Sequence, residues 1–324
     1  MSHEITIRQD GFAEMAFVGK TPWHELGQQL DQNSDMATWR KAAGMDWTLE
    51  SAPVHFEVKD NNEHHNLNSF AGQNVLYRSD TNAPMSIVSD RYKPVQPAEV
   101  LDFFKDLVEE SGFKLHTAGT LFGGKRLWAL AETGKFGEIC KDDGIGGFLL
   151  LSTSCDRSLS TTARFTSVRV VCNNTLSMAT KDGTDCVSFT HAREFDHALM
   201  KAKLGLAVES FSAFMEMGKY LQKQNMTAYA ASEFVTNLLA NPAKLLDPEY
   251  NINDSKGFTK ILDLFEGQAK GSELVGQTKW GMLNAVTEYF DHHHPARTAD
   301  ARLNNTWFGT GNSVKAKAIQ LLVA

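Results

Sequence analysis

Residues 147–156 read GFLLLSTSCD, and the run 147–151 contains no polar side chain. A strand with one face in water alternates apolar and polar residues, so an unbroken apolar run predicts a strand covered on both faces. Residues 167–176, SVRVVCNNTL, read as a second strand, and residues 186–191, CVSFTH, as a third. We therefore expect a β-sheet in which residues 147–156 are buried from both sides.

Two hairpins and two helices are predicted before this stretch. Residues 74–92 and 114–134 each contain two strand-like runs around a turn with Pro or Gly-Gly, which is typical of a hairpin. Ser34 and Gly44 bracket a short helix, as its N-cap and as the residue that follows its end. Pro97 opens a longer helix, because proline suits the first helical turn.

The pattern changes near residue 194, and the remainder of the chain is predominantly helical in its periodicity. Thr227 and Ser313 are candidate N-caps within this part. The predicted fold class is therefore α+β. A β-rich part with a mainly antiparallel sheet and a packed helix, residues 1–193, precedes a helical part, residues 194–324, that packs on the sheet or extends it.

Composition and targeting signals place few limits on function. The 324 residues are 42% hydrophobic and 22% charged, as in an ordinary globular protein. No run approaches the ~20 apolar residues of a membrane helix, and the N-terminus has no apolar signal-peptide core. We expect a cytoplasmic protein without a membrane partner. The four cysteines form no CxxC pair, which disfavours a zinc ribbon.

No motif for a cofactor or a covalent nucleophile is present. The glycine run 144–147 lacks the Gly-Lys-Ser/Thr of a phosphate loop, and no GxSxG elbow occurs. The consecutive residues His292, His293 and His294 would point about 100° apart on a helix, so they cannot bind one metal ion together. We expect no cofactor, no metal and no enzyme activity. A metal-dependent nuclease is the minor alternative, because it needs clustered carboxylates, and the densest acids of the β-rich part are Asp142, Asp143, Asp182 and Asp185.

Positive charge is concentrated in residues 144–181, which contain four basic residues and a single acid, although the net charge of the chain is -7. The same segment is rich in Ser, Thr and Asn, which bind phosphate and sugar oxygens. Arginines on strands beside aromatic rings are typical of single-stranded nucleic acid binding. The alternative is a solvated sheet face with scattered charge. The candidate nucleic-acid-binding residues are Arg157, Arg164, Arg169, Asn173, Asn174, Lys125 and Arg126.

Several stretches resemble an uncharacterised family of phage- and plasmid-encoded proteins, classed as a domain of unknown function. They are GFAEMAFVGKTPWH at 11–24, VSDRYKPVQ at 88–96, SVRVVCNNTL at 167–176 and the ending from Lys279 to Gly309. The resemblance covers nearly the whole chain and implies a mobile-element origin and a bacterial cytosol. Genes of this kind often accompany replication and recombination functions. The arrangement of a sheet followed by helices is also loosely similar to Rad52-type single-strand annealing proteins, at the level of fold only.

Two functional hypotheses follow. The first is a non-catalytic DNA-transaction factor that binds or anneals single-stranded DNA in recombination or replication and acts as a homo-oligomer. In it, Arg164 and Arg169 pair with phosphates, while Asn173 and Asn174 bond sugar or base edges. The second is a protein-interaction module that inhibits a host defence or replication protein, which fits the negative net charge.

Overall fold

The computed structural model shows a large, mainly antiparallel sheet, a smaller antiparallel sheet and a group of helices. It describes residues 6–8, 10–19, 26–59, 65–169, 175–177, 186–189, 209–240, 251–297 and 299–324.

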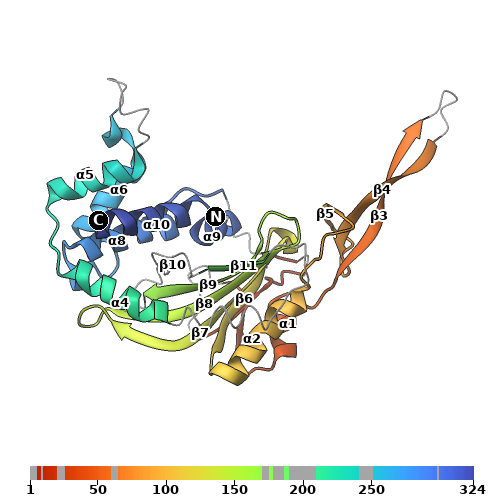
Figure 1. Cartoon of the computed structure of the whole chain (residues 1–324), viewed down its shortest axis with the longest axis horizontal. Helices are drawn as coiled ribbons and strands as arrows, with labels where there is room; N and C mark the ends of the chain where they lie inside the picture. The colour runs from red at the N-terminus through yellow and green to blue at the C-terminus, as the bar shows by residue number, and fades with distance from the viewer. Residues whose placement is uncertain are drawn as a thin grey trace.

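A large sheet dominates the N-terminal part (Figure 1). Eight strands of the described residues form it, in the order β10-β9-β8-β7-β6-β1-β2, and β11 also pairs with β9. Every pairing is antiparallel except that of β1 with β2. The strands are β1 (Met15–Val18), β2 (Gln28–Leu30), β6 (Lys114–Leu121), β7 (Arg126–Glu138), β8 (Gly144–Ser154), β9 (Thr161–Arg169), β10 (Thr175–Ser177) and β11 (Cys186–Phe189).

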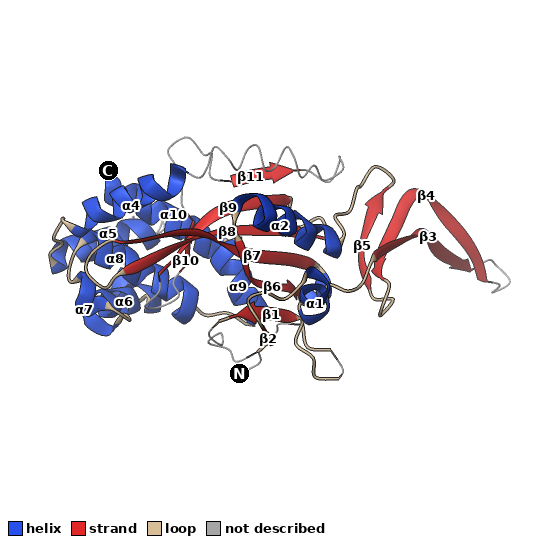
Figure 2. Cartoon of the chain, turned by 90° about the horizontal axis from the view of Figure 1, so that it is seen from below, coloured by secondary structure: helices blue, strands red, loops and turns tan. Residues whose placement is uncertain are grey.

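A smaller sheet is made of β3 (Leu49–Lys59), β4 (His65–Arg78) and β5 (Pro84–Ser89), in that order. Its strands are antiparallel, so the predicted hairpin at 74–92 is confirmed. The outer part of the β3–β4 pair projects away from the rest of the molecule as a two-stranded ribbon (Figures 1 and 2).

Helices cover both faces of the large sheet. In Figure 1, α1 (Met36–Ala42) and α2 (Pro97–Ser111) lie below it and α9 (Ala299–Trp307) lies above it. We call these two sides the α2 face and the α9 face. The other described α-helices gather beside the sheet. They are α4 (Glu209–Gln222), α5 (Ala228–Leu239), α6 (Lys256–Asp263), α7 (Ser272–Val275), α8 (Lys279–Glu288) and α10 (Thr310–Val323). The π-helical turn Leu264–Gln268 extends α6, and the π-helical turn Tyr289–His293 extends α8.

Strand β8 is buried from both sides, as its apolar run predicts. Leu149 faces the main core together with the residues of α2, and it is 0% exposed. Leu150 faces a second apolar cluster under α9, with Trp128 and Trp307, and it is 3% exposed. The α+β fold class, with its antiparallel sheet and packed helix, is confirmed.

Several local predictions were wrong. The N-cap of α1 is Asp35, one residue after Ser34, and its side chain accepts from the backbone N–H of Thr38. Helix α10 begins after Gly309 and not at Ser313.

The predicted strand at 167–176 is two strands. β9 ends at Arg169 and β10 begins at Thr175, and the two pair with each other. The boundary predicted near residue 193 lies in 190–208, outside the described residues, so it stays a prediction.

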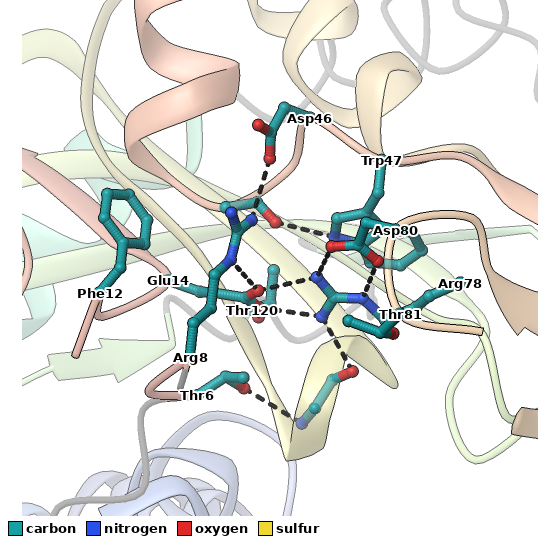
Figure 3. A network of polar contacts seen from close by, with 12 residues as sticks. Thr6, Arg8, Phe12, Glu14, Asp46, Trp47, Arg78, Asp80, Thr81 and Thr120 are labelled. Atoms are coloured by element: carbon teal, nitrogen blue, oxygen red, sulfur yellow. Dashed lines mark hydrogen bonds and ion pairs between the residues drawn. The ribbon is translucent and has the colours of Figure 1, made fainter. Parts of the chain in front are cut away.

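A buried carboxylate, Glu14, joins the two sheets (Figure 3). Glu14 is 0% exposed and lies immediately before β1. Arg78, the last residue of β4, donates from Nη1 and Nη2 to the two carboxylate oxygens over 3.1 and 2.8 Å. Arg8 donates from Nε over 2.8 Å. This ion pair therefore ties the smaller sheet to the edge of the large one.

Arg78 also positions the turn between β6 and β7 (Figure 3). Its Nη1 donates to the carbonyl of Gly123 over 3.1 Å, and its guanidinium lies 4.4 Å from the centre of the Trp47 ring. Its hydrogen bonds to Asp80 lower the pKa of that carboxyl. Gly124 has φ +92°, and a Cβ there would lie 2.8 Å from Trp47 and 2.9 Å from Arg78. Only glycine fits this close approach.

We expect Arg78→Met to destabilise the protein by ~3 kcal/mol, because it leaves a buried carboxylate without its main cation. This loss is at the low end of what removing one partner of a buried ion pair usually costs, because Arg8 still binds Glu14. Urea unfolding followed by circular dichroism measures it. The control is Asp102→Asn, which removes a partly exposed pair with Arg40 and should cost less than ~1 kcal/mol. Equal losses in both variants would contradict a special role for the buried pair.

Candidate functional site

Two turns of the large sheet lie side by side at one of its ends. Residues 122–125 join β6 to β7, and residues 155–160 join β8 to β9. Because β7 and β8 are neighbours, Arg126 lies opposite Ser154, and the backbone N–H of Cys155 donates to the carbonyl of Lys125 over 2.7 Å. Five side chains at these turns form what we call the basic end: Phe122, Lys125, Arg126, Arg157 and Ser158. Asp156 of the same turn accepts from the backbone N–H of Ser158 over 3.0 Å.

Arg126 is the central residue of the basic end. Its Nε and Nη2 lie 3.3 and 3.1 Å from the Ser158 hydroxyl, which accepts from them. Its guanidinium carbon lies 5.6 Å from the centre of the Phe122 ring, in a cation–π contact. Phe122 is 37% exposed, so part of the ring faces solvent. The contacts place a cation, an aromatic ring and a hydroxyl together.

The charge of Arg126 has no ionic partner among the described residues. No carboxylate is within salt-bridge distance of it, and burial lowers the pKa of its guanidinium, with the charge of Asp156 acting in the opposite direction. A half-buried cation without a counter-ion is unfavourable unless a ligand supplies the negative charge. The arrangement can bind an anion.

Backbone strain accompanies this charge. Phe122 has φ +55° and Arg157 has φ +67°, and each lies in one of the two turns. The left-handed region costs a residue with a side chain ~1–2 kcal/mol, and strained backbone of this kind clusters at functional sites. The other two described non-glycine residues with positive φ are Asn82 and Asp142, types that tolerate this conformation.

The structure brings together only part of the predicted site. Lys125, Arg126 and Arg157 are at the basic end, and the Nη1 of Arg157 donates to the carbonyl of Ile87 over 3.4 Å. Arg164 is in the middle of β9 on the α9 face, and its Nη1 donates to the carbonyl of Trp307 over 3.3 Å.

The remaining predicted residues are away from this end or are not described. Arg169 is at the far end of β9, opposite Ile145, and its side chain is not described. Asn173 and Asn174 lie outside the described residues. Their proposed contacts with sugar or bases stay a prediction.

Sequence reasoning missed Phe122 and Ser158. The sequence did contain a signal for Phe122. The hairpin predicted at 114–134 has its tip at Gly123, so the residue before the tip, Phe122, is expected to be exposed. Ser158 is one of several serines in residues 144–181, and the sequence does not distinguish it from the others. Its pairing with Arg126 depends on β7 and β8 being adjacent, which short-range patterns do not reveal.

The acids considered for a metal site do not assemble in the described part of the chain. Asp143 is 0% exposed and accepts from the indole Nε1 of Trp280 over 2.9 Å. Asp182 and Asp185 lie outside the described residues. Among the residues that the structure does describe, no group of His, Cys, Asp and Glu is arranged to hold a metal ion. None of the described helices combines the length and apolarity needed to span a bilayer.

Comparison with known proteins defines the family. The model of a domain of unknown function, DUF932, matches residues 84–307, which is more than half of the chain. The protein therefore belongs to this family, as its sequence resemblance implied, and the comparisons show no likeness to Rad52-type proteins. No curated protein and no solved structure matches the chain. The matched region runs from β5 to the end of α9, so it includes the basic end.

We expect Arg157→Asn to stabilise the protein by ~0.5–1 kcal/mol, since asparagine tolerates a positive φ better than arginine does. Urea unfolding measures the change. Arg91→Asn is the matched control, because Arg91 is also exposed in a turn but has no positive φ, and it should give no gain. A loss of stability in Arg157→Asn would show that the Arg157 side chain contributes more than its backbone costs.

Proposed function

We propose that this protein binds single-stranded DNA at the basic end of its large sheet, as a non-catalytic factor in strand annealing, recombination or replication. The observation that carries the proposal is the pair of strained residues, Phe122 and Arg157, held in adjacent turns beside Arg126, a cation without a carboxylate partner among the described residues. The proposal includes a location in the cytoplasm of a bacterial host.

The chemistry of the basic end matches that of a single strand. Its phosphates carry negative charge, which Lys125, Arg126 and Arg157 would neutralise. Its unstacked bases present flat faces, and a partly exposed ring such as Phe122 can stack on one of them. A net charge of -7 favours such a local contact over extended wrapping. Since three cations make a small site, self-association would raise the affinity by repetition.

We expect a fluorescently labelled single strand to bind with an affinity that falls as salt rises. In Arg157→Gln or Lys125→Gln the slope of log K against log salt should shrink by ~0.7 for each phosphate that the variant no longer neutralises. Phe122→Leu should weaken binding by ~1–3 kcal/mol with an unchanged slope, because stacking carries no charge. Fluorescence anisotropy across a salt series measures both effects.

Lys219→Gln is the control for these variants, because it removes an exposed lysine on α4, in the helical part. It should leave both affinity and slope unchanged. Absence of salt-sensitive binding at micromolar protein would refute the proposal. So would equal losses in Lys219→Gln and Arg157→Gln, since binding would then follow net charge and not the basic end.

Light scattering coupled to size exclusion tests the homo-oligomer. A species larger than the monomer that elutes together with the single strand supports self-association on DNA. If the protein is a monomer both with and without DNA, the homo-oligomer is refuted. Single-strand binding is then tested by the anisotropy measurement alone.

The β3–β4 ribbon supports a second candidate function, interaction with a host protein. Phe56, Val58 and Phe70 project from one face of the ribbon and are 46%, 44% and 54% exposed. Two strands alone are marginally stable in water, and exposed apolar groups of this kind mark interaction surfaces. In this second function the protein is an interaction module that inhibits a host defence or replication protein, and the ribbon is the surface that contacts the host protein.

Recovery of a stoichiometric host protein by the wild-type chain but not by Phe56→Ser/Phe70→Ser would favour this second function. A wild-type chain that recovers no such partner from a bacterial lysate would count against it. Asn66→Ser/Asn68→Ser serves as the control, because these residues lie on the same ribbon face without being apolar.

A further inference from the structure

Strand β7 and helix α9, which meet where Trp128 packs on Trp307, carry most of the unpaired buried polar atoms of the described residues. In the described part of the chain, six buried side-chain nitrogen or oxygen atoms have no hydrogen-bond partner. Five of them belong either to the start of β7 or to α9: Arg126 Nη1, Trp128 Nε1, Asn304 Oδ1, Thr306 Oγ1 and Trp307 Nε1. Buried polar groups are normally paired, so two unpaired indole N–H groups on tryptophans that pack against each other indicate a specific role.

Three of these atoms are donors on side chains of the α9 face: Arg126 Nη1, Trp128 Nε1 and Trp307 Nε1. Arg126 and Trp128 are alternate residues of β7, so both project on the α9 face. The indole rings of Trp128 and Trp307 have centres 5.0 Å apart and planes at 70°. The two tryptophans are 2% and 8% exposed. Indole and guanidinium nitrogens only donate, so the complementary group must be an acceptor.

Two other buried indoles in the described residues, those of Trp47 and Trp280, are paired. The Nε1 of Trp47 donates to the carbonyl of Gly44 over 2.8 Å. The Nε1 of Trp280 donates to the Asp143 carboxylate over 2.9 Å. The fold therefore supplies acceptors to buried indoles where a structural role requires them, and it supplies none among the described residues to Trp128 and Trp307.

The acceptor should also carry negative charge. Arg126 has no carboxylate within salt-bridge distance among the described residues, and burial lowers the pKa of its guanidinium. The Ser158 hydroxyl lies against the same guanidinium and can donate its proton outward, because its oxygen already accepts from Arg126. A group with several oxygens can accept from all of these donors, whereas a halide offers no such geometry.

We propose that Arg126, Trp128 and Trp307 bind an oxyanion of the phosphate class at the junction of α9 and the sheet. For a phosphate within a DNA strand the inference rests on the proposed function; for free inorganic phosphate it stands alone. Because Trp307 belongs to α9 and its carbonyl accepts from Arg164 of β9, the anion joins the helix to the sheet. Its binding therefore stabilises the docked position of α9.

The test uses the indole N–H signals of the full chain in a transverse-relaxation-optimised ¹H–¹⁵N spectrum, assigned by Trp128→Phe and Trp307→Phe. Inorganic phosphate is titrated against chloride at constant ionic strength. The Trp128 and Trp307 signals should shift with phosphate alone, and the Trp47 and Trp280 signals should not. Arg126→Gln should weaken the phosphate effect at least tenfold, while Arg126→Lys keeps part of it. Unmoved signals, or equal shifts of the Trp280 signal, overturn the inference.

A second arm separates this inference from the proposed function. If phosphate moves the two signals and single-stranded DNA binds and moves them too, both hold. If phosphate moves them but DNA does not bind, the oxyanion site stands and the proposed function falls. If DNA binds while neither ligand moves the indole signals, the proposed function stands and the oxyanion site falls. Should Trp128→Phe fail to fold, Trp307→Phe and Arg126→Gln still assign and test the site.

Discussion

The buried ion pair between Glu14 and Arg78 is the interaction on which the arrangement of this protein depends. It connects residues 64 positions apart, one beside the large sheet and one at the end of the smaller sheet. Burying both charges costs desolvation energy that opposes their attraction, whereas the fixed geometry of the pair sets how the two sheets are oriented. Through its bond to Gly123 it also fixes the turn that presents Phe122, Lys125 and Arg126.

Two arginines near this turn have opposite electrostatic environments. Arg78 binds Glu14 and Asp80, stacks on Trp47, and is 3% exposed, so its charge is compensated within the protein. Arg126 contacts a hydroxyl and an aromatic ring but no carboxylate of the described chain. The contrast separates a structural cation from one that is available to a ligand. Rigid support from the first keeps the second in place, which lowers the ordering cost of binding.

Local patterns predicted the elements whose burial is simple. The apolar run of β8 and the caps at Gly44 and Thr227 follow from short-range rules, and the structure shows them. Short-range rules do not delimit helix α9, because its sequence, ADARLNNTW, contains too few apolar residues for a clear helical period. It is held by Trp307 against Trp128, a contact that depends on tertiary packing. The split of 167–176 into two strands was missed for a similar reason, since both halves are strand-like and only their pairing separates them.

The sequence by itself determined the α+β fold class, with strands mainly before helices, the family and the concentration of basic residues in residues 144–181. Only the tertiary structure decided which basic residues lie at the same end of the sheet, since Lys125 and Arg126 fall outside that segment. Alternation along a strand assigns side chains to two faces, but strand pairing decides which turns share an end of the sheet. The turns that carry Lys125, Arg126 and Arg157 lie side by side because β7 and β8 are neighbours, and Arg164 turns to Trp307 because α9 covers its face. These contacts span long separations in sequence, where local propensity carries no information.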